Sequence, residues 1–373
     1  MKPRRLALPL ALAVVLLITS VEAASPGART FFMGFTPAEY DTTPQALEDT
    51  YAFIGRHADL IAHHFVKGVP WPEAHDQQRF PAAVERDLQF RQLKRLPRQR
   101  VFLALSPITV AAQGLGGYWG ASGNMPRPGS WNRKDFDDPE VITAYSNFCT
   151  VMIRLFRPDF MAYGVEVNGL VKDAPAEWPK FVKFARLVYS GLKVEHPNLP
   201  IFLTLQLDYF WADEPRQRKA IVEILPYTDY LAISTYPYVD RYADPHHIPS
   251  DYFARLAAIA PTKPFAVAET GFTAKEVSVL GTRIPGRPDW QDAYMKFLLA
   301  ESDRLQARFV VWFVPRDYDL LVNRLKALRV PPATIELYGL WKSNGLIDAE
   351  GNARKALDTW TAWLNRRRGA AGR

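Results

Sequence analysis

Two glutamates each stand at the end of an apolar stretch of the sequence. Glu166 follows the run 160–165, and Glu269 follows the run 264–268. An ionised carboxylate is costly to bury without a partner, so a glutamate at such a position needs a partner or a task. Two facing glutamates can cleave a glycosidic bond, because one protonates the leaving oxygen while the other attacks the anomeric carbon or activates water. The alternative is that each glutamate makes a structural ion pair or binds loop amides.

The elements that must position these glutamates are short β-rich runs that alternate with longer amphipathic runs from residue 30 onward. The predicted strands are 30–35, 59–66, 100–107, 159–167, 200–208, 230–236, 264–269 and 308–314. The predicted helices are 44–56, 81–93, 139–156, 178–196, 216–225, 251–259, 290–306 and 352–366. Several strands are continuous apolar runs, as in parallel sheets covered on both faces. Eight strand–helix units predict a single-domain (β/α)8 barrel over residues 24–365, with the active site at the carboxyl ends of its strands.

Two connections are much longer than the others. The stretch 110–138 follows the third strand, on the face where barrel loops build active sites, and is a candidate lid or subsite wall. The stretch 318–344 precedes the last helix. Four tryptophans lie in loops after strands two, three and five: Trp71, Trp119, Trp131 and Trp211. Aromatic rings stack on the apolar faces of sugars, so these rings either line subsites or pack in the core.

The first 23 residues have the pattern of a secretory signal. Basic residues precede the apolar stretch 6–18, and a small-x-small site ends at Ala23. The alternative is a retained membrane anchor, but the stretch is shorter than the roughly 20 residues that a spanning helix needs. The sequence therefore predicts cleavage of residues 1–23, a secreted or periplasmic protein, and no stable membrane insertion after cleavage.

The charge of the remaining chain argues against nucleic-acid binding. Removing residues 1–23 leaves 43 basic and 38 acidic residues, a net charge of +5. Four arginines in 366–373 supply most of that charge, in a segment predicted to be a basic flexible tail. The folded body is then close to neutral, without a basic stripe for phosphates. The oligomeric state cannot be predicted from these features.

Neither a cofactor nor a metal ion is predicted. The single cysteine, Cys149, excludes an intramolecular disulfide and a four-cysteine zinc site. His63 and His64 are adjacent on a predicted strand, so their side chains point to opposite faces and cannot bind one ion. A glycine-rich phosphate loop is also missing from the sequence.

Short motifs at the predicted strand ends resemble those of glycoside hydrolase clan A, and among its members most of all the family 53 endo-β-1,4-galactanases. These motifs are Gly164-Val165-Glu166 with Asn168-Gly169-Leu170, Ser234-Thr235-Tyr236-Pro237-Tyr238, Val311-Trp312-Phe313-Val314-Pro315 and the stretch 345–352. The resemblance implies a retaining O-glycosyl hydrolase that acts on a β-linked polysaccharide or oligosaccharide. Glu166 would be its acid/base and Glu269 its nucleophile.

The resemblance and the chemistry of sugars together give roles to further residues. Tyr236 is expected to position Glu269, and Trp312 to form the floor under the cleaved sugar. The expected partners of sugar hydroxyls are His64, Asn168, Gln206 and Asp208. His64 would stand in for an arginine that clan members carry on strand two; the alternative is a structural histidine. For Gln206 and Asp208 the alternative is a salt bridge or contact at the rim.

Two departures from the clan pattern support another hypothesis. Val165 occupies the position of an asparagine that binds the sugar 2-hydroxyl, and the segment 60–65 has only histidines where the arginine is expected. Contacts to that hydroxyl supply several kcal/mol in the transition state. The second hypothesis is therefore a catalytically silent barrel that binds a glycan or cell-wall polymer. A third is a barrel enzyme that uses the two glutamates as proton shuttles in other chemistry.

Overall fold

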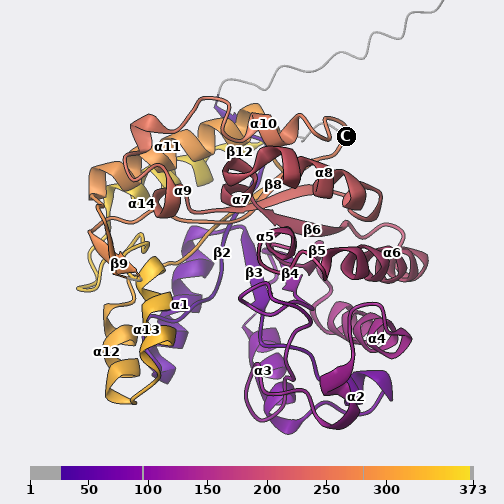
Figure 1. Cartoon of the computed structure of the whole chain (residues 1–373). Coiled ribbons are helices and arrows are strands. Elements are labelled where there is room, and N and C mark those ends of the chain that lie inside the picture. Colours follow the sequence, from indigo (N-terminus) through magenta and orange to yellow (C-terminus); the bar gives the residue numbers. More distant parts are fainter. Residues whose placement is uncertain (1–26, 95, 280, 370–373) are drawn as a thin grey trace, which may run out of the picture.

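The eight predicted strands close into a parallel barrel in a computed structural model that describes residues 27–94, 96–279 and 281–369 (Figure 1). The order around the barrel is β11-β2-β3-β4-β5-β6-β7-β8. Its strands are β2 (Phe32–Phe35), β3 (Leu60–Phe65), β4 (Arg100–Leu105), β5 (Phe160–Gly164), β6 (Ile201–Gln206), β7 (Leu231–Thr235), β8 (Phe265–Thr270) and β11 (Phe309–Trp312). The (β/α)8 fold predicted from the sequence is confirmed.

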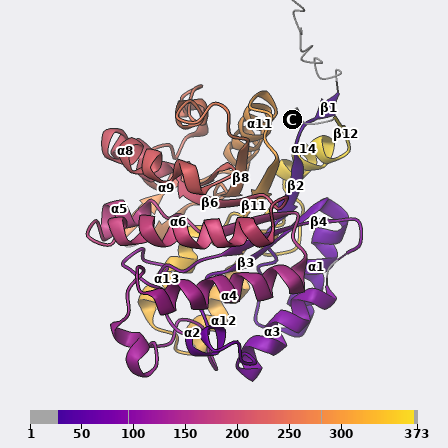
Figure 2. The same cartoon turned by 90° about the vertical axis from the view of Figure 1, so that its right-hand side faces the viewer.

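Helices cover the outside of this barrel, and α4 and α6 lie side by side across one wall (Figure 2). The outer helices are α1 (Pro44–His57), α3 (Ala82–Leu93), α4 (Pro139–Phe156), α6 (Trp178–Glu195), α8 (Glu214–Ile224), α11 (Pro288–Arg304) and α14 (Lys355–Leu364). In the sixth unit the predicted helix 251–259 is reduced to α10 (Ala254–Ala257). Turns replace its first residues, and Tyr252 and Phe253 are fully buried in this segment.

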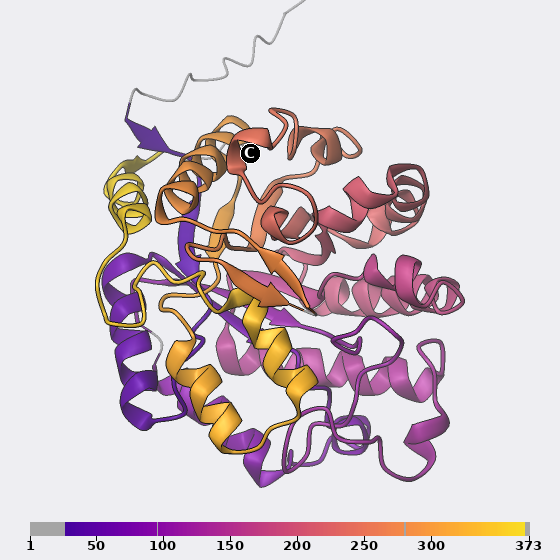
Figure 3. The ribbon, with the colours of Figure 1, turned by 60° about the vertical axis from the view of Figure 1, so that its left-hand side comes forward.

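Shorter elements occupy the connections between these units. They are α2 (Trp71–His75), α5 (Gly169–Asp173), α7 (Leu207–Ala212), α9 (Pro237–Asp240), α12 (Asp319–Ala327), α13 (Pro332–Trp341), the hairpin β9 (Val277–Val279) and β10 (Thr282–Ile284), and three 3-10 turns at Gly129–Arg133, Leu225–Tyr227 and Pro245–His247. The stretch 318–344 thus forms the α12–α13 hairpin, which stands in the foreground of Figure 3. Within the described residues no helix is long and apolar enough to cross a membrane.

The two ends of the described chain meet on the outside of the barrel. The strand β1 (Ala28–Arg29) pairs in parallel with β12 (Arg367–Arg368). The segment predicted as a basic flexible tail, 366–373, therefore begins with a short strand, and its last four residues lie outside the described part. The predicted signal peptide, residues 1–23, also lies outside it. The domain boundaries stay predictions.

The barrel interior is built in layers, because alternate residues of each strand face inward. Four phenylalanines, Phe102, Phe160, Phe202 and Phe309, pack against one another in one layer. Two residues further along β4 and β5 the inward side chains are Ala104 and Ala162. Ala104 lines a small cavity at the carboxyl ends of the strands.

Both strands that lead to the glutamates contain an irregularity just before them. On β8, Val267 pairs with Ile233 whereas Glu269 pairs with Ser234, so one extra residue is inserted. On β5 the same kind of shift falls between Ala162 and Gly164. A β-bulge rotates the side chains that follow it. The bulges therefore change which face of the strand each glutamate occupies.

A buried ion pair fixes the chain beyond β11. Arg354 and Asp317 form a bidentate pair with N···O distances of 2.7 and 2.5 Å, and their side chains are 6% and 0% exposed. We expect Arg354→Met to lower the free energy of unfolding by about 3 kcal/mol, because it leaves a buried carboxylate without its partner. Urea unfolding measures the loss. The control is Arg324→Met, which removes a more exposed pair with Asp41 and should cost under about 1 kcal/mol.

Candidate active site

Two polar side chains contact Glu269 at the carboxyl ends of the barrel strands. Its Oε1 accepts a bond of 2.6 Å from the Tyr236 hydroxyl, and its Oε2 lies 3.0 Å from Nδ1 of His64. Burial raises the pKa of Tyr236 well above its ordinary value, and the charge of Glu269 adds to the shift, so the phenol keeps its proton and donates. One carboxylate oxygen thus accepts a hydrogen bond and the other lies beside an imidazole nitrogen, so the carboxyl group is contacted from both sides.

Glu166 lies at the same mouth in a different environment. Its backbone is left-handed, with φ 51°, and its N–H donates to Oγ1 of Thr204 at 2.8 Å. A non-glycine residue in this region is uncommon and is found where other contacts hold the backbone. Burial raises the pKa of Glu166 to about 7, with the negative charge of Glu269 acting in the same direction. A hydrogen bond from Ser234 and the nearby His64 act in the opposite direction.

The two carboxyl groups therefore differ in what they can do. The Glu166 carboxyl keeps a large share of its proton near neutral pH, so it can donate that proton. The Glu269 carboxylate is aligned and ready to attack an electron-poor carbon. A carboxyl group that keeps its proton beside a carboxylate that can attack is the usual arrangement of an acid and a nucleophile in one site.

A small cavity opens beside Glu269, which is one of its lining residues. Its hydroxyl groups come from Thr36, Thr204 and Ser234. Alanines at 62, 104 and 268 supply much of its apolar wall. Val165 is half-buried against the barrel interior and also lines this cavity. The space next to the carboxylates thus has a polar side and an apolar side.

His64 contacts the expected nucleophile directly, at the place where the sequence comparison expected an arginine. We expect His64→Ala to lower kcat/KM about thirtyfold, because losing a 3.0 Å polar contact to a charged group costs about 2 kcal/mol. His64→Arg, which restores a donor, should recover part of the loss. Steady-state kinetics on both variants measure the effect, with His75→Asn as a surface control. A His64→Ala enzyme as active as wild type would contradict this role.

The adjacent His63 lies on the other face of β3. It is fully buried, with its ring 4.9 Å from that of Phe156. The two histidines therefore diverge, as the strand geometry predicts. Among the described residues no group of three His, Cys, Asp or Glu side chains gathers as metal ligands would.

Asn168 is a correction to the expected sugar-binding residues. It is 0% exposed. Its Nδ2 donates to the Gln206 carbonyl at 3.0 Å and to Oε1 of Gln217 at 2.8 Å, and its Oδ1 accepts from the Gln206 amide at 2.7 Å. The side chain holds the end of β6 to the turn after β5, so it is not available to a substrate. Gln206 is partly exposed, and its Oε1 has no partner among the described residues, which suits a sugar ligand.

Asp208 also faces into the protein. Its carboxylate accepts bonds from Tyr252, Thr235 and the Tyr236 amide, and the residue is 9% exposed. It belongs to the first turn of α7, directly after β6. Its contacts are those of a residue that organises the end of β7, not those of a group that awaits a hydroxyl.

Trp312 is a second correction, because it does not form the floor of the site. It is 0% exposed, packs against Tyr294 and donates from Nε1 to the Asn344 carbonyl at 2.9 Å. Val311 faces the barrel interior, so the next residue must face the outer helices. The aromatic side chains near the mouth are instead Phe313 and Trp341, whose rings lie 5.3 Å apart, with Trp341 also 6.0 Å from Tyr236.

Trp341 was missed because it ends α13, inside the stretch 318–344 that the sequence marks only as a surplus connection. The four loop tryptophans named from the sequence do not lie at the mouth as Trp341 does. Trp71, Trp119 and Trp131 are 0%, 3% and 9% exposed, and Trp71 stacks on Trp131. These three side chains are part of the buried core, and Trp119 and Trp131 belong to the stretch 110–138 itself. Trp211 is half-buried and stacks on Tyr252.

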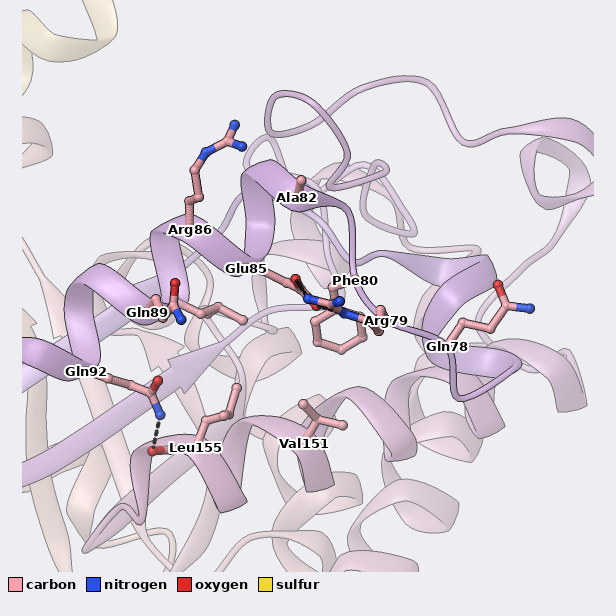
Figure 4. A pocket seen from close by; sticks show the side chains of 11 residues that line it. Gln78, Arg79, Phe80, Ala82, Glu85, Arg86, Gln89, Gln92, Val151 and Leu155 are labelled. Carbon is pink, nitrogen blue, oxygen red and sulfur yellow. Dashed lines mark hydrogen bonds and ion pairs between the residues drawn. The ribbon is translucent and has the colours of Figure 1, made fainter.

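A larger hollow lies on the outer wall, between α3 and α4 (Figure 4). It has about 1060 Å³ of empty space, and Arg79, Phe80, Glu85, Gln92 and Leu155 are among its lining residues. Arg79 and Glu85 pair with each other there, and Gln92 donates to the Leu155 carbonyl. Neither glutamate of the barrel mouth lines it, so it is separate from the candidate active site.

Comparison with known proteins finds similarity in structure alone. No protein-family model matches the chain, and no curated protein matches it in sequence. An exo-β-1,4-mannosidase from Opitutaceae bacterium strain TAV5 has 15% identity and a TM-score of 0.62, covering 91% of this chain and 60% of that one. A GH53 catalytic domain from Ignisphaera aggregans has 18% identity and a TM-score of 0.56, covering 91% and 98%.

A third structure, a GH5_18 protein from Streptomyces cattleya in complex with Manβ1-4GlcNAc, has 14% identity and a TM-score of 0.62, covering 92% of this chain and 83% of that one. Two fungal β-1,4-galactanases are described by a further match at 13% identity and a TM-score of 0.56, covering 89% and 99%. The chain thus has the same barrel fold as these glycoside hydrolase structures. It spans 60% of the length of the mannosidase.

Proposed function

We propose that this protein is an exported retaining glycoside hydrolase that cleaves a β-linked polysaccharide or oligosaccharide. The observation that carries the proposal is the pair at the barrel mouth. Glu269 accepts a hydrogen bond from Tyr236 and lies 3.0 Å from Nδ1 of His64, and Glu166 has a carboxyl whose pKa is raised to about 7. The named activities of the structural neighbours, a mannosidase and galactanases among them, support a carbohydrate substrate.

Each carboxyl has a step to perform. Glu166 passes its proton to the glycosidic oxygen while the bond from that oxygen to the anomeric carbon breaks, and Glu269 forms a bond to the same carbon. The ionised Glu166 then takes a proton from water, whose oxygen attacks the anomeric carbon and releases Glu269. Two inversions at one carbon give net retention. Tyr236 and His64 hold the attacking carboxylate in place.

A glycan-binding barrel without turnover is the second candidate. The observation that favours it is Val165, whose side chain can neither donate nor accept a hydrogen bond and which lines the cavity beside Glu269. Such a protein keeps a sugar-binding cleft but lacks a contact that tightens in the transition state.

The proposal that the protein is exported rests on the segment 1–23 of the sequence.

The test is product release from a panel of β-galactans, β-glucans, β-mannans and xylans, read by a reducing-end assay and chromatography. Wild type and Glu269→Ala are compared. We expect release by wild type from at least one substrate and its loss in the variant. Glycan binding without release by either protein would reject the hydrolase and favour the binding barrel.

A further inference from the structure

Asp208 carries an inference that rests on the proposed function and extends it. We infer that Asp208 is a positioning residue, which clamps the end of β7 so that Tyr236 holds the Glu269 carboxylate for attack. Asp208 is not among the residues that line the cavity, and Tyr236, whose amide it binds, donates to Glu269. Its effect reaches the carboxylate through the backbone and hydroxyl of Tyr236.

The clamp consists of several short bonds to two consecutive residues. Oδ2 of Asp208 accepts from the Tyr236 amide at 2.9 Å, and Oδ1 accepts from the Thr235 hydroxyl at 3.2 Å. Tyr252 donates to Oδ1 at 2.6 Å and lies 2.7 Å from the Thr235 hydroxyl. The network is buried, where hydrogen bonds to a charged group are strongest.

The opposite side of the same segment is fixed by the neighbour of Glu269. The Thr270 hydroxyl donates to the Thr235 carbonyl at 2.8 Å and lies 2.6 Å from the Tyr294 hydroxyl. Thr235 is thus held from β8 on one side and from Asp208 on the other. Tyr236 leaves the strand with φ −134° and ψ 73° and is followed by Pro237, so regular strand pairing does not continue through it. Its orientation depends on these side-chain bonds.

A negative charge on Asp208 also affects the pKa of Glu166. It raises the pKa of Glu166, as the burial of Glu166 and the charge of Glu269 do, while His64 acts in the opposite direction. The other titratable groups around Asp208 are Tyr252, Tyr238 and Tyr294, and its charge helps raise the pKa of each. Those phenols stay neutral at working pH, so they do not compensate for the loss of the carboxylate.

Asp208→Asn tests the clamp, because the amide has nearly the same shape but no charge. The NH₂ group of the asparagine must then face the Tyr236 N–H or a hydroxyl, both of which donate to Asp208 in the wild-type protein. We expect kcat to fall by up to about a hundredfold with KM unchanged within about twofold, since small misplacements of reacting groups have effects of this size. The alkaline limb of the kcat/KM profile should move to lower pH, because removing a negative charge lowers the pKa of Glu166.

The matched control is Asp229→Asn. Asp229 also bridges β6 and β7, accepting from the Ile201 amide at 2.8 Å and from the Tyr189 hydroxyl at 2.6 Å, but at the opposite end of the strands. It should leave kcat and the pH profile unchanged for the folded fraction. A double-mutant cycle of Asp208→Asn with Tyr236→Phe should be strongly non-additive, because both changes release the same carboxylate.

Three kinetic or thermal outcomes and one spectroscopic outcome would overturn the inference. A raised KM with normal kcat would make Asp208 a substrate-binding residue, lost melting temperature with normal kcat would make it purely structural, and additive losses would separate it from Tyr236. A titration of ¹³C-labelled glutamates by NMR needs no substrate. Glu269 carboxyl signals that are the same in Asp208→Asn as in wild type reject the inference even if wild type releases no product, whereas absence of release alone rejects only the proposed function.

Discussion

Glu269→Gln should lower kcat/KM by on the order of 10⁴-fold, which corresponds to about 5.5 kcal/mol of barrier. The glutamine is isosteric with Glu269, but an amide cannot form the covalent bond to the anomeric carbon. It would also present an NH₂ group to the Tyr236 hydroxyl, which donates to the carboxylate, or to His64, whose Nδ1 lies 3.0 Å from it. Kinetics with an aryl glycoside of the substrate class found in the panel would measure the loss.

A rescue experiment separates loss of the nucleophile from loss of the fold. In Glu269→Ala, azide can enter the vacated space and attack the anomeric carbon from the same side. We expect a glycosyl azide of inverted configuration and partial recovery of the rate. Glu350→Gln, at an exposed position, serves as the control and should behave as wild type. Retention of a tenth or more of wild-type activity in Glu269→Gln would contradict the assignment.

Glu166→Gln has the second largest expected effect. For substrates with poor leaving groups we expect kcat/KM to fall about 10²–10⁴-fold, because the leaving oxygen departs without a proton. Aryl glycosides with acidic leaving groups need no such help, so their bond-breaking step should be nearly unaffected. The ratio between the two substrates therefore reports on general-acid catalysis by this residue.

The pH profile provides an independent check on Glu166. The raised pKa, about 7, means that the acid form is present below this value and is lost as the pH rises through it. Wild-type kcat/KM, which reports the free enzyme, should therefore decline above about pH 7. Glu166→Gln should abolish that limb, whereas the surface control Glu177→Gln should keep it. A limb that persists in Glu166→Gln would assign it to another group.

The sequence was informative about the barrel and about the carboxylates for one physical reason. Parallel strands of a barrel end at one face, so residues at the ends of different strands meet there without any knowledge of their contacts. This is why Glu166, Glu269, Tyr236 and His64 were predicted and lie at one mouth. The continuous apolar runs made the strands recognisable.

The orientation of side chains at those ends was less predictable. Trp312 was expected inside because it lies near the end of a strand, but alternation along β11 places Phe309 and Val311 inward and Trp312 among the helices. The bulges before the two glutamates, which change the same alternation, have no clear sequence signal. A one-residue shift exchanges the two faces of a strand, so such errors fall at the strand ends.

Asn168 and Asp208 show a further difficulty. Amides and carboxylates suit sugar hydroxyls, but they equally suit the unpaired backbone groups where a strand turns into a loop. Only the partners decide between the two, and both side chains bond to neighbouring strand ends. Trp341 reaches the mouth from an inserted helix, which residue spacing along the barrel strands cannot reveal.

The most direct test of the central claim is the anomeric configuration of the first product. The substrate identified in the panel would be hydrolysed in an NMR tube, and the anomeric proton signals would be followed from the first minutes, before mutarotation. A retaining mechanism with Glu269 as nucleophile predicts that the β-anomer appears first. Initial release of the α-anomer would contradict the account, because it would require direct attack by water and no covalent bond to Glu269.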